Sequence, residues 1–188
     1  MTARDRARVC GFFLIGLCAW LVFCNRLSLA EPAKPAPATV QLKTIKYDQL
    51  VEAVKAHRGK VVVVDVWGDF CIPCKKEFPH LVEMYKKYSG DGLVCISVCI
   101  ATSDDDLKKD EPKALKFLTG QNAVFQNFLL EDGWKIMETK WKIKGVPATF
   151  VFDRDGLRAK KFTNDDPDNQ YDMKDVEKLV IELLRPRK

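Results

Sequence analysis

The four residues Cys71-Ile72-Pro73-Cys74 hold the side chains best suited to chemistry in this chain. A strand-like run ends just before them and helical spacing begins just after them, so we expect Cys71 at a helix N-terminus. There, unpaired N–H groups and the helix dipole stabilise a thiolate, the form of cysteine that attacks disulfides. Cys74 lies one turn deeper, within bridging reach and shielded by the helix. The spacing predicts thiol-disulfide exchange, with Cys71 as nucleophile and Cys74 as resolving thiol.

A structural zinc site or a static disulfide is the alternative interpretation of this pair. Structural zinc needs four ligands, and the remaining candidates beyond the N-terminal segment are Cys95, Cys99, His57 and His80. Two cysteines four residues apart on one strand lie ~13 Å apart, so Cys95 and Cys99 cannot bridge and are expected to be small core residues. The two histidines are expected to be surface or boundary residues and not catalysts. We therefore predict redox activity, with no metal and no cofactor.

Residues 1–30 have the pattern of an export segment. Arginines precede an uncharged apolar run at 9–23, which is shorter than the ~20 residues of a membrane span, and Ser28 and Ala30 stand at −3 and −1 of a cleavage point. The pattern predicts a secretory signal peptide, and an uncleaved membrane anchor is the alternative. Both predict an exported protein of the periplasm or cell envelope, tethered in the second case. Residues 31–39 are rich in proline and alanine and predict a linker before a domain at 40–188.

Composition narrows the class of partner. The net charge of the chain is +5. Residues 1–30 carry four arginines and one acid, so their removal leaves about +2, which is too little for a nucleic-acid binder. Three of the seven cysteines also lie in this segment. The four that remain are an even number, but a domain of this size does not need a disulfide framework.

The elements that must position the cysteine pair alternate between strands and helices. The run VVVVDVW at 61–67 predicts a central strand covered on both faces, because it is almost wholly β-branched. Alternation of this kind predicts an α/β fold in which helices flank a mixed sheet, and Asp155-Gly156 predicts a hairpin at one sheet edge. The expected strands are 61–67, 93–100, 123–130, 148–153 and 157–162, and the expected helices are about 47–58, 74–87, 112–119, 134–141 and 176–183.

The segment VVVVDVWGDFCIPCKKEFPHLVEMY and the downstream segment GVPATF at 145–150 resemble thioredoxin-like proteins of the TlpA/ResA group. The resemblance covers roughly residues 40–184 and implies a thioredoxin-like three-layer sandwich. It further implies an exported or membrane-tethered reductant of the bacterial envelope, for which cytochrome c maturation is a frequent assignment. The implied partners are a disulfide-containing protein substrate and an upstream thiol donor, such as a membrane protein.

The resemblance also implies a substrate-binding surface around the cysteines. Pro147 is expected to be a cis-proline that faces the disulfide and shapes the substrate groove, and Val146 to offer backbone groups to an extended substrate segment. Trp67, Ile72 and Pro73 are the other expected substrate-binding residues.

Two acids are expected to support the chemistry. Asp65 stands at the family position of a buried acid, and burial among valines raises the pKa of a carboxyl, which suits it to accept the proton of Cys74. The alternative for Asp65 is an ordinary polar residue at a strand end. Glu77 lies three residues after Cys74 on the same helix face. The resemblance implies that it tunes the thiols, and a solvated helix charge is the alternative.

Some residues depart from the family pattern. Phe70 replaces the usual tryptophan before the first cysteine, and Asp69 places a negative charge close to Cys71. An adjacent carboxylate is expected to oppose thiolate formation, so the reduction potential and the rate are not carried over from the family. The segment 101–124 is long and leaves the substrate surface unspecified.

Two other functions use related folds. A non-catalytic copper carrier or scaffold generally spaces its cysteines more widely and adds a histidine ligand, which the present spacing does not match. A peroxide reductase needs a threonine and arginine arrangement that the sequence does not supply.

Overall fold

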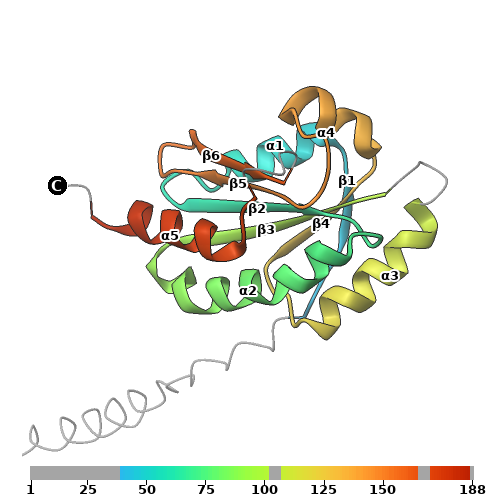
Figure 1. Cartoon of the computed structure of the whole chain (residues 1–188), viewed down its shortest axis with the longest axis horizontal. Coiled ribbons are helices and arrows are strands. Elements are labelled where there is room, and N and C mark those ends of the chain that lie inside the picture. The colour runs from blue at the N-terminus through green and yellow to red at the C-terminus, as the bar shows by residue number, and fades with distance from the viewer. Residues whose placement is uncertain (1–38, 102–106, 165–169, 187–188) are drawn as a thin grey trace, which may run out of the picture. The chain divides into compact units, whose positions relative to one another are not determined.

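A six-stranded mixed sheet lies at the centre of the structure, a computed structural model that describes residues 39–101, 107–164 and 170–186 (Figure 1). The strand order is β1-β4-β3-β2-β5-β6, in which the first four strands are parallel and β5 and β6 run antiparallel to their neighbours. The strands are β1 Lys43–Ile45, β2 Val61–Trp67, β3 Leu93–Ile100, β4 Gln126–Leu130, β5 Ala148–Phe152 and β6 Arg158–Thr163.

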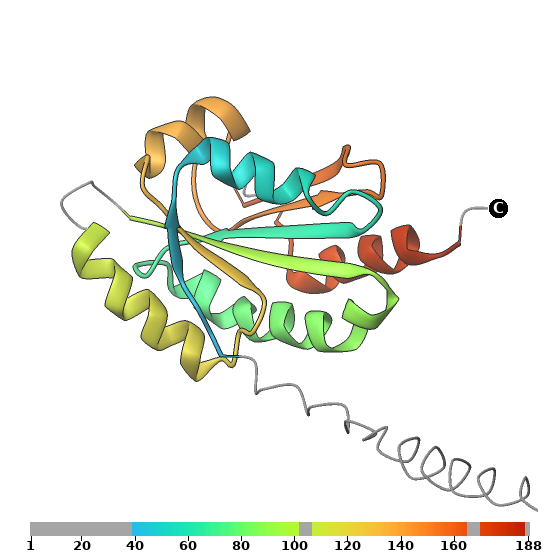
Figure 2. The same cartoon turned by 180° about the vertical axis from the view of Figure 1, so that it is seen from behind.

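Helices cover both faces of this sheet (Figure 2). Helices α1 (Tyr47–Lys55) and α4 (Gly133–Trp141) lie on one face, and α2 (Ile72–Tyr88), α3 (Leu107–Gly120) and α5 (Met173–Leu184) lie on the other. A short 3₁₀ turn, Ser89–Asp91, follows α2. The arrangement confirms the predicted three-layer α/β sandwich with a mixed central sheet.

Strand β2 lies between β3 and β5 and is covered on both faces, so every one of its residues is buried. Alternate side chains starting at Val61 enter the core under α2, α3 and α5, whereas those starting at Val62 enter the core under α1 and α4. A β-branched residue therefore packs well at either kind of position. This alternation also places Asp65 on the α2 side, which is the side of the cysteine pair.

The neighbouring strand β3 carries the two further cysteines of the domain. Cys95 and Cys99 are free and buried, as predicted from their spacing. Burial raises the pKa of both thiols, that of Cys99 to about 12, so they remain protonated at neutral pH.

Several predicted bounds are off by two or three residues, and α3 and β1 show the clearest differences from the predictions. Helix α3 includes Leu107, so the predicted start near Pro112 is wrong. Leu107 packs against the core and Asp110 is buried with an ion pair to Lys113, and this packing outweighs the cost of a proline inside the helix. Strand β1 was not expected, because its three residues are too few to show a periodic pattern.

The predicted export segment at 1–30, with its cysteines, and the linker up to residue 38 lie outside the described residues. Among the helices that the structure describes, none has the length and apolar character required of a membrane span.

Candidate active site around the Cys71–Cys74 disulfide

The cysteine pair forms a disulfide where β2 gives way to α2. Cys71 is the N-cap residue of α2, and its N–H donates to the carbonyl oxygen of Gly68 at 2.9 Å, which closes the turn after the strand. Cys74 lies in the first turn, and the two Cα atoms are 5.3 Å apart. The N–H of Cys74 donates to Cys71 Sγ at 3.2 Å. The helix terminus therefore already directs a backbone donor at the sulfur that would carry negative charge after reduction.

The two cysteines are largely covered, while their neighbours are open to solvent. Cys71 is 5% exposed and Cys74 is 3% exposed, whereas Phe70 and Ile72 are 52% and 69% exposed. Pro73 is also exposed. Exposed apolar side chains beside a covered disulfide are a feature of surfaces that bind another protein.

The loop before β5 lies beside this turn. Strands β2 and β5 are antiparallel neighbours with Val66 opposite Ala148, so the end of β2 meets the start of β5. The peptide bond between Val146 and Pro147 is cis, as the family resemblance implies. Both residues are partly exposed. The structure thus brings the predicted substrate-binding residues Val146 and Pro147 next to the predicted redox turn.

Asp65 lies buried at the centre of a polar cluster. Thr149 Oγ1 donates to Asp65 Oδ1 at 2.9 Å and lies 3.0 Å from the Tyr171 hydroxyl oxygen. Burial raises the pKa of Asp65 from 3.8 to about 7, the hydrogen bond from Thr149 opposes this rise, and the charge of Glu77 adds to it. Asp65 therefore lies buried within β2, and its role as a proton acceptor stays a prediction. A carboxyl that is half-protonated near neutral pH can both accept and return a proton.

Glu77 connects α2 to the start of α5. Its Oε2 accepts a hydrogen bond of 3.2 Å from the N–H of Met173, the first residue of α5. The side chain is partly buried. Burial is the largest cause of the raised pKa of Asp65 and of Tyr171, and the charge of Glu77 adds to the rise of both. Glu77 thus contacts the N-terminus of α5, and its influence on the thiols stays a prediction.

Trp67 does not lie where a substrate could reach it. Its side chain is 0% exposed and packs edge-on against Phe78, with ring centroids 5.5 Å apart, and also contacts Phe117. The interpretation of Trp67 as a substrate-binding residue is therefore wrong, because its position in β2 directs the ring into the core. Trp67 instead supports α2 by packing against it from the sheet.

The charge of Asp69 is balanced within the site. Lys75 Nζ lies 2.6 Å from Asp69 Oδ1, and both side chains are partly buried. The lysine ammonium also lies 5.5 Å from the ring centroid of Phe117. The carboxylate expected to oppose the Cys71 thiolate is thus paired with a cation on the first turn of α2.

Thr149 and Tyr171 are the members of the acid cluster that the sequence did not indicate. Thr149 lies in the GVPATF segment, two residues after the cis-proline, and strand alternation could have placed it opposite Asp65. No local pattern marks Tyr171, which approaches the cluster from the residues just before α5.

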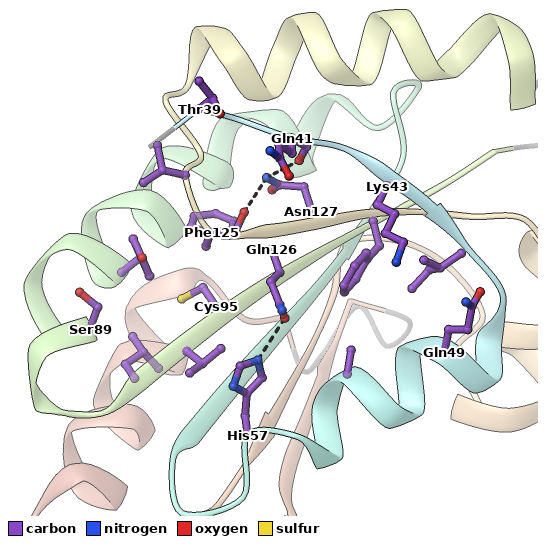
Figure 3. A pocket seen from close by; sticks show the side chains of 17 residues that line it. Thr39, Gln41, Lys43, Gln49, His57, Ser89, Cys95, Phe125, Gln126 and Asn127 are labelled. Carbon is purple, nitrogen blue, oxygen red and sulfur yellow. Dashed lines mark hydrogen bonds between the residues drawn. The ribbon is translucent and has the colours of Figure 1, made fainter. Parts of the chain in front are cut away.

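The two histidines lie apart from the disulfide. His57 Nε2 is 3.1 Å from Gln126 Oε1 in a hollow of about 760 Å³ (Figure 3). His80 lies elsewhere on α2, with its Nδ1 3.8 Å from Glu83 Oε2. This hollow is lined by the first residues of β3 and β4, and neither redox cysteine lines it. In the part of the chain that the structure describes, no three His, Cys, Asp or Glu side chains converge as a metal site.

Comparison with known protein families assigns the chain to one of them. The model of the AhpC/TSA family matches residues 32–160, more than half of the chain. This chain belongs to the AhpC/TSA family.

Relatives of this AhpC/TSA-family chain are named as redox proteins. The thiol-disulfide oxidoreductase ResA of Bacillus cereus is 28% identical over 119 residues, which cover 63% of this chain and 64% of that protein. ResA of Bacillus subtilis is 28% identical over 159 residues, covering 81% of this chain and 82% of that one. The chain thus spans slightly less than two thirds of the first relative's length, and it spans about half the length of ResA of Bacillus anthracis.

A solved structure confirms the thioredoxin-like fold. The putative thiol:disulfide interchange protein DsbE of Chlorobium tepidum superposes with a TM-score of 0.57 at 23% identity. The superposition covers 70% of this AhpC/TSA-family chain and 85% of the other.

Proposed function

We propose that this chain is a thiol-disulfide oxidoreductase that exchanges disulfides with protein substrates through Cys71 and Cys74. The observation that carries the proposal is the disulfide at the N-terminus of α2, where the N–H of Cys74 donates to Cys71 Sγ. Its position beside the cis-peptide at Pro147 and the names of the ResA relatives support the same reaction.

In the proposed reaction, the reduced protein transfers two electrons to a substrate disulfide. The Cys71 thiolate attacks one substrate sulfur, so a mixed disulfide forms and the other substrate sulfur leaves as a thiolate. Cys74 then loses its proton and attacks Cys71 Sγ, which releases the second substrate sulfur. The product is the Cys71–Cys74 disulfide seen in the structure, together with a reduced substrate dithiol.

Asp65 is the proposed acceptor of the Cys74 proton. It extends from β2 on the sheet face covered by α2, and its pKa of about 7 lets it take up a proton at neutral pH. Thr149 orients one carboxyl oxygen, and Glu77 raises the proton affinity of the acid by its charge. Ile72, Pro73, Val146 and Pro147 form the proposed contact surface for the substrate.

The resemblance to TlpA/ResA proteins supports a more specific role. We propose that the chain acts as a reductant in the cell envelope, with cytochrome c maturation as the first process to examine. An upstream thiol donor would return the disulfide to the dithiol. Direction depends on the reduction potential relative to that of the compartment, so a measured potential tests the reductant assignment directly.

The decisive experiment is substrate trapping. In Cys74→Ser the mixed disulfide on Cys71 cannot be resolved, so envelope proteins should accumulate as adducts that disappear with dithiothreitol. Cys71→Ser/Cys74→Ser is the matched control and should trap none. The wild type should also catalyse reduction of insulin disulfides. If no Cys71-dependent adduct forms and insulin is not reduced, the proposed function is wrong.

A further inference from the structure

A groove lies alongside the proposed redox centre, between the turn before α2 and the start of α4. Its volume is about 330 Å³, and it is lined by Phe70, Ala101, Trp134, Lys144, Gly145 and Val146. Phe70 directly precedes Cys71, and Val146 directly precedes the cis-proline. Any chain segment that reaches the disulfide across these two residues must therefore pass the groove.

The walls of the groove are apolar and aromatic. Ala101 is buried, Trp134 is half-buried, and the Phe70 side chain is 52% exposed. The Phe70 ring is folded back over Gly68, where an added Cβ would lie only 2.4 Å from a ring carbon. Apolar walls and a volume at the small end of ligand sites fit one large side chain.

The groove also has a charge of one sign. Lys144 supplies the only charged side chain among the six lining residues. The segment that leads to it from α4 also carries Lys142, whose carbonyl oxygen accepts a hydrogen bond of 2.8 Å from Lys161 Nζ, so further positive charge lies close by. A carboxylate on the bound segment would find a favourable potential here, and an ammonium would be repelled.

We propose that this groove is a specificity site that takes a bulky apolar side chain, preferably aromatic, next to the attacked cysteine of the substrate, with a neighbouring carboxylate paired to Lys144. This inference rests on the proposed function, because the groove would bind side chains that flank a cysteine of the substrate disulfide. Phe70 and Trp134 form its apolar walls. The preferred substrates are accordingly extended segments in which cysteine is flanked by an aromatic and an acidic residue.

Disulfide-linked peptides that differ only beside the cysteine test the proposal. Peptides containing Cys-Phe-Glu, Cys-Phe-Lys and Cys-Ser-Glu are reduced by the dithiol form of the protein, and kcat/KM is compared. The wild type should prefer phenylalanine to serine about tenfold, and glutamate to lysine by about threefold to tenfold. Lys144→Glu should reverse the charge preference, and Trp134→Ala should remove most of the aromatic preference.

Controls separate this site from general reactivity. Each peptide rate is divided by the same protein's rate with hydroxyethyl disulfide, which is small and uncharged. Lys140→Glu makes the same charge change on α4 outside the lining and should keep the wild-type preferences. Phe70→Ser, at an exposed position, repeats the aromatic test if Trp134→Ala does not fold.

The outcomes are distinct for the two proposals. Normal reduction of hydroxyethyl disulfide without any peptide preference would overturn the specificity site alone. Equal effects of Lys140→Glu and Lys144→Glu would also overturn it, because the preference would then follow net charge. No reduction of any disulfide would overturn the proposed function and the specificity site together.

Discussion

Replacing Asp65 with asparagine should stabilise the folded protein at alkaline pH while slowing its chemistry. Asp65 is buried under the helices that cover its face of β2, and burial raises its pKa from 3.8 to about 7. Asparagine is close in size and stays neutral at every pH. Its side-chain oxygen can still accept the hydrogen bond that Thr149 Oγ1 now donates to Asp65.

The size of the effect follows from the pKa difference between folded and unfolded chains. Below about pH 4, both states hold the Asp65 proton and the carboxyl makes no pH-dependent difference to stability. As the pH rises from about 4 to about 7, the unfolded chain loses this proton while the folded chain retains it, so the wild type loses stability. At about 1.4 kcal/mol per pKa unit, the loss is about 4 kcal/mol by pH 7 and stays constant above it.

Not all of this stability is regained in the variant. The asparagine side-chain N–H groups need partners in the same cluster, and an unsatisfied one costs about 1 to 3 kcal/mol. Asp65→Asn should therefore exceed the wild type by about 1 to 3 kcal/mol near pH 8. Near pH 4 it should be equally or less stable.

Urea unfolding of the oxidised protein at about pH 4 and pH 8 measures this difference. Glu138→Gln, which removes an exposed acid on α4, is the control and should follow the wild type at both pH values. The same Asp65→Asn protein should reduce insulin about 10² times more slowly, because Cys74 loses its proton acceptor. If the stability difference between Asp65→Asn and wild type does not change with pH, Asp65 is not a buried acid with a raised pKa.

Three further changes test the surroundings of this acid and of the first cysteine. Tyr171→Phe removes the hydroxyl that fixes the threonine donor, so the pKa of Asp65 should rise further and the midpoint of the pH-rate profile should move to higher pH. Glu77→Gln removes the charge that raises the same pKa, so the midpoint should move to lower pH, and the weakened N-terminal contact of α5 should cost about 1 kcal/mol in thermal unfolding. Lys75→Gln leaves Asp69 unpaired and should slow alkylation of the first cysteine severalfold, while the double change with Asp69→Asn should restore the rate.

The sequence predicts the redox turn well because local signals agree there. The β-branched run at 61–67 is long enough to indicate a buried strand, and the observed bounds of β2 match it. The observed bounds of β3 also match the predicted strand. In this strand the spacing of Cys95 and Cys99 already excludes a bridge between them. Where strand, turn and helix follow each other directly, the chemistry of the pair is set within a few residues.

Other features depend on contacts that no local pattern encodes. Thr149 meets Asp65 across 84 residues, and Tyr171 joins them from the start of another helix. In a strand that is almost wholly apolar, the sequence does not distinguish side chains that reach the surface from those that enter the core. The buried position of the Trp67 ring could therefore not be predicted. Helix α3 continues on both sides of Pro112 because its packing against the sheet outweighs a local preference to start there.

The pairing of β2 with β5 has a consequence for how such a protein can diversify. Because Val66 lies opposite Ala148, one strand pair holds the sulfur-bearing turn and the cis-peptide in fixed relation. Loops that do not join β2 to α2 or lead into β5, and the solvent-facing side of α3, do not determine the distance between the cysteine turn and the cis-peptide. They are therefore free to vary in length and composition as partners change, which makes them the natural positions for redirecting the protein to new clients without rebuilding its chemistry.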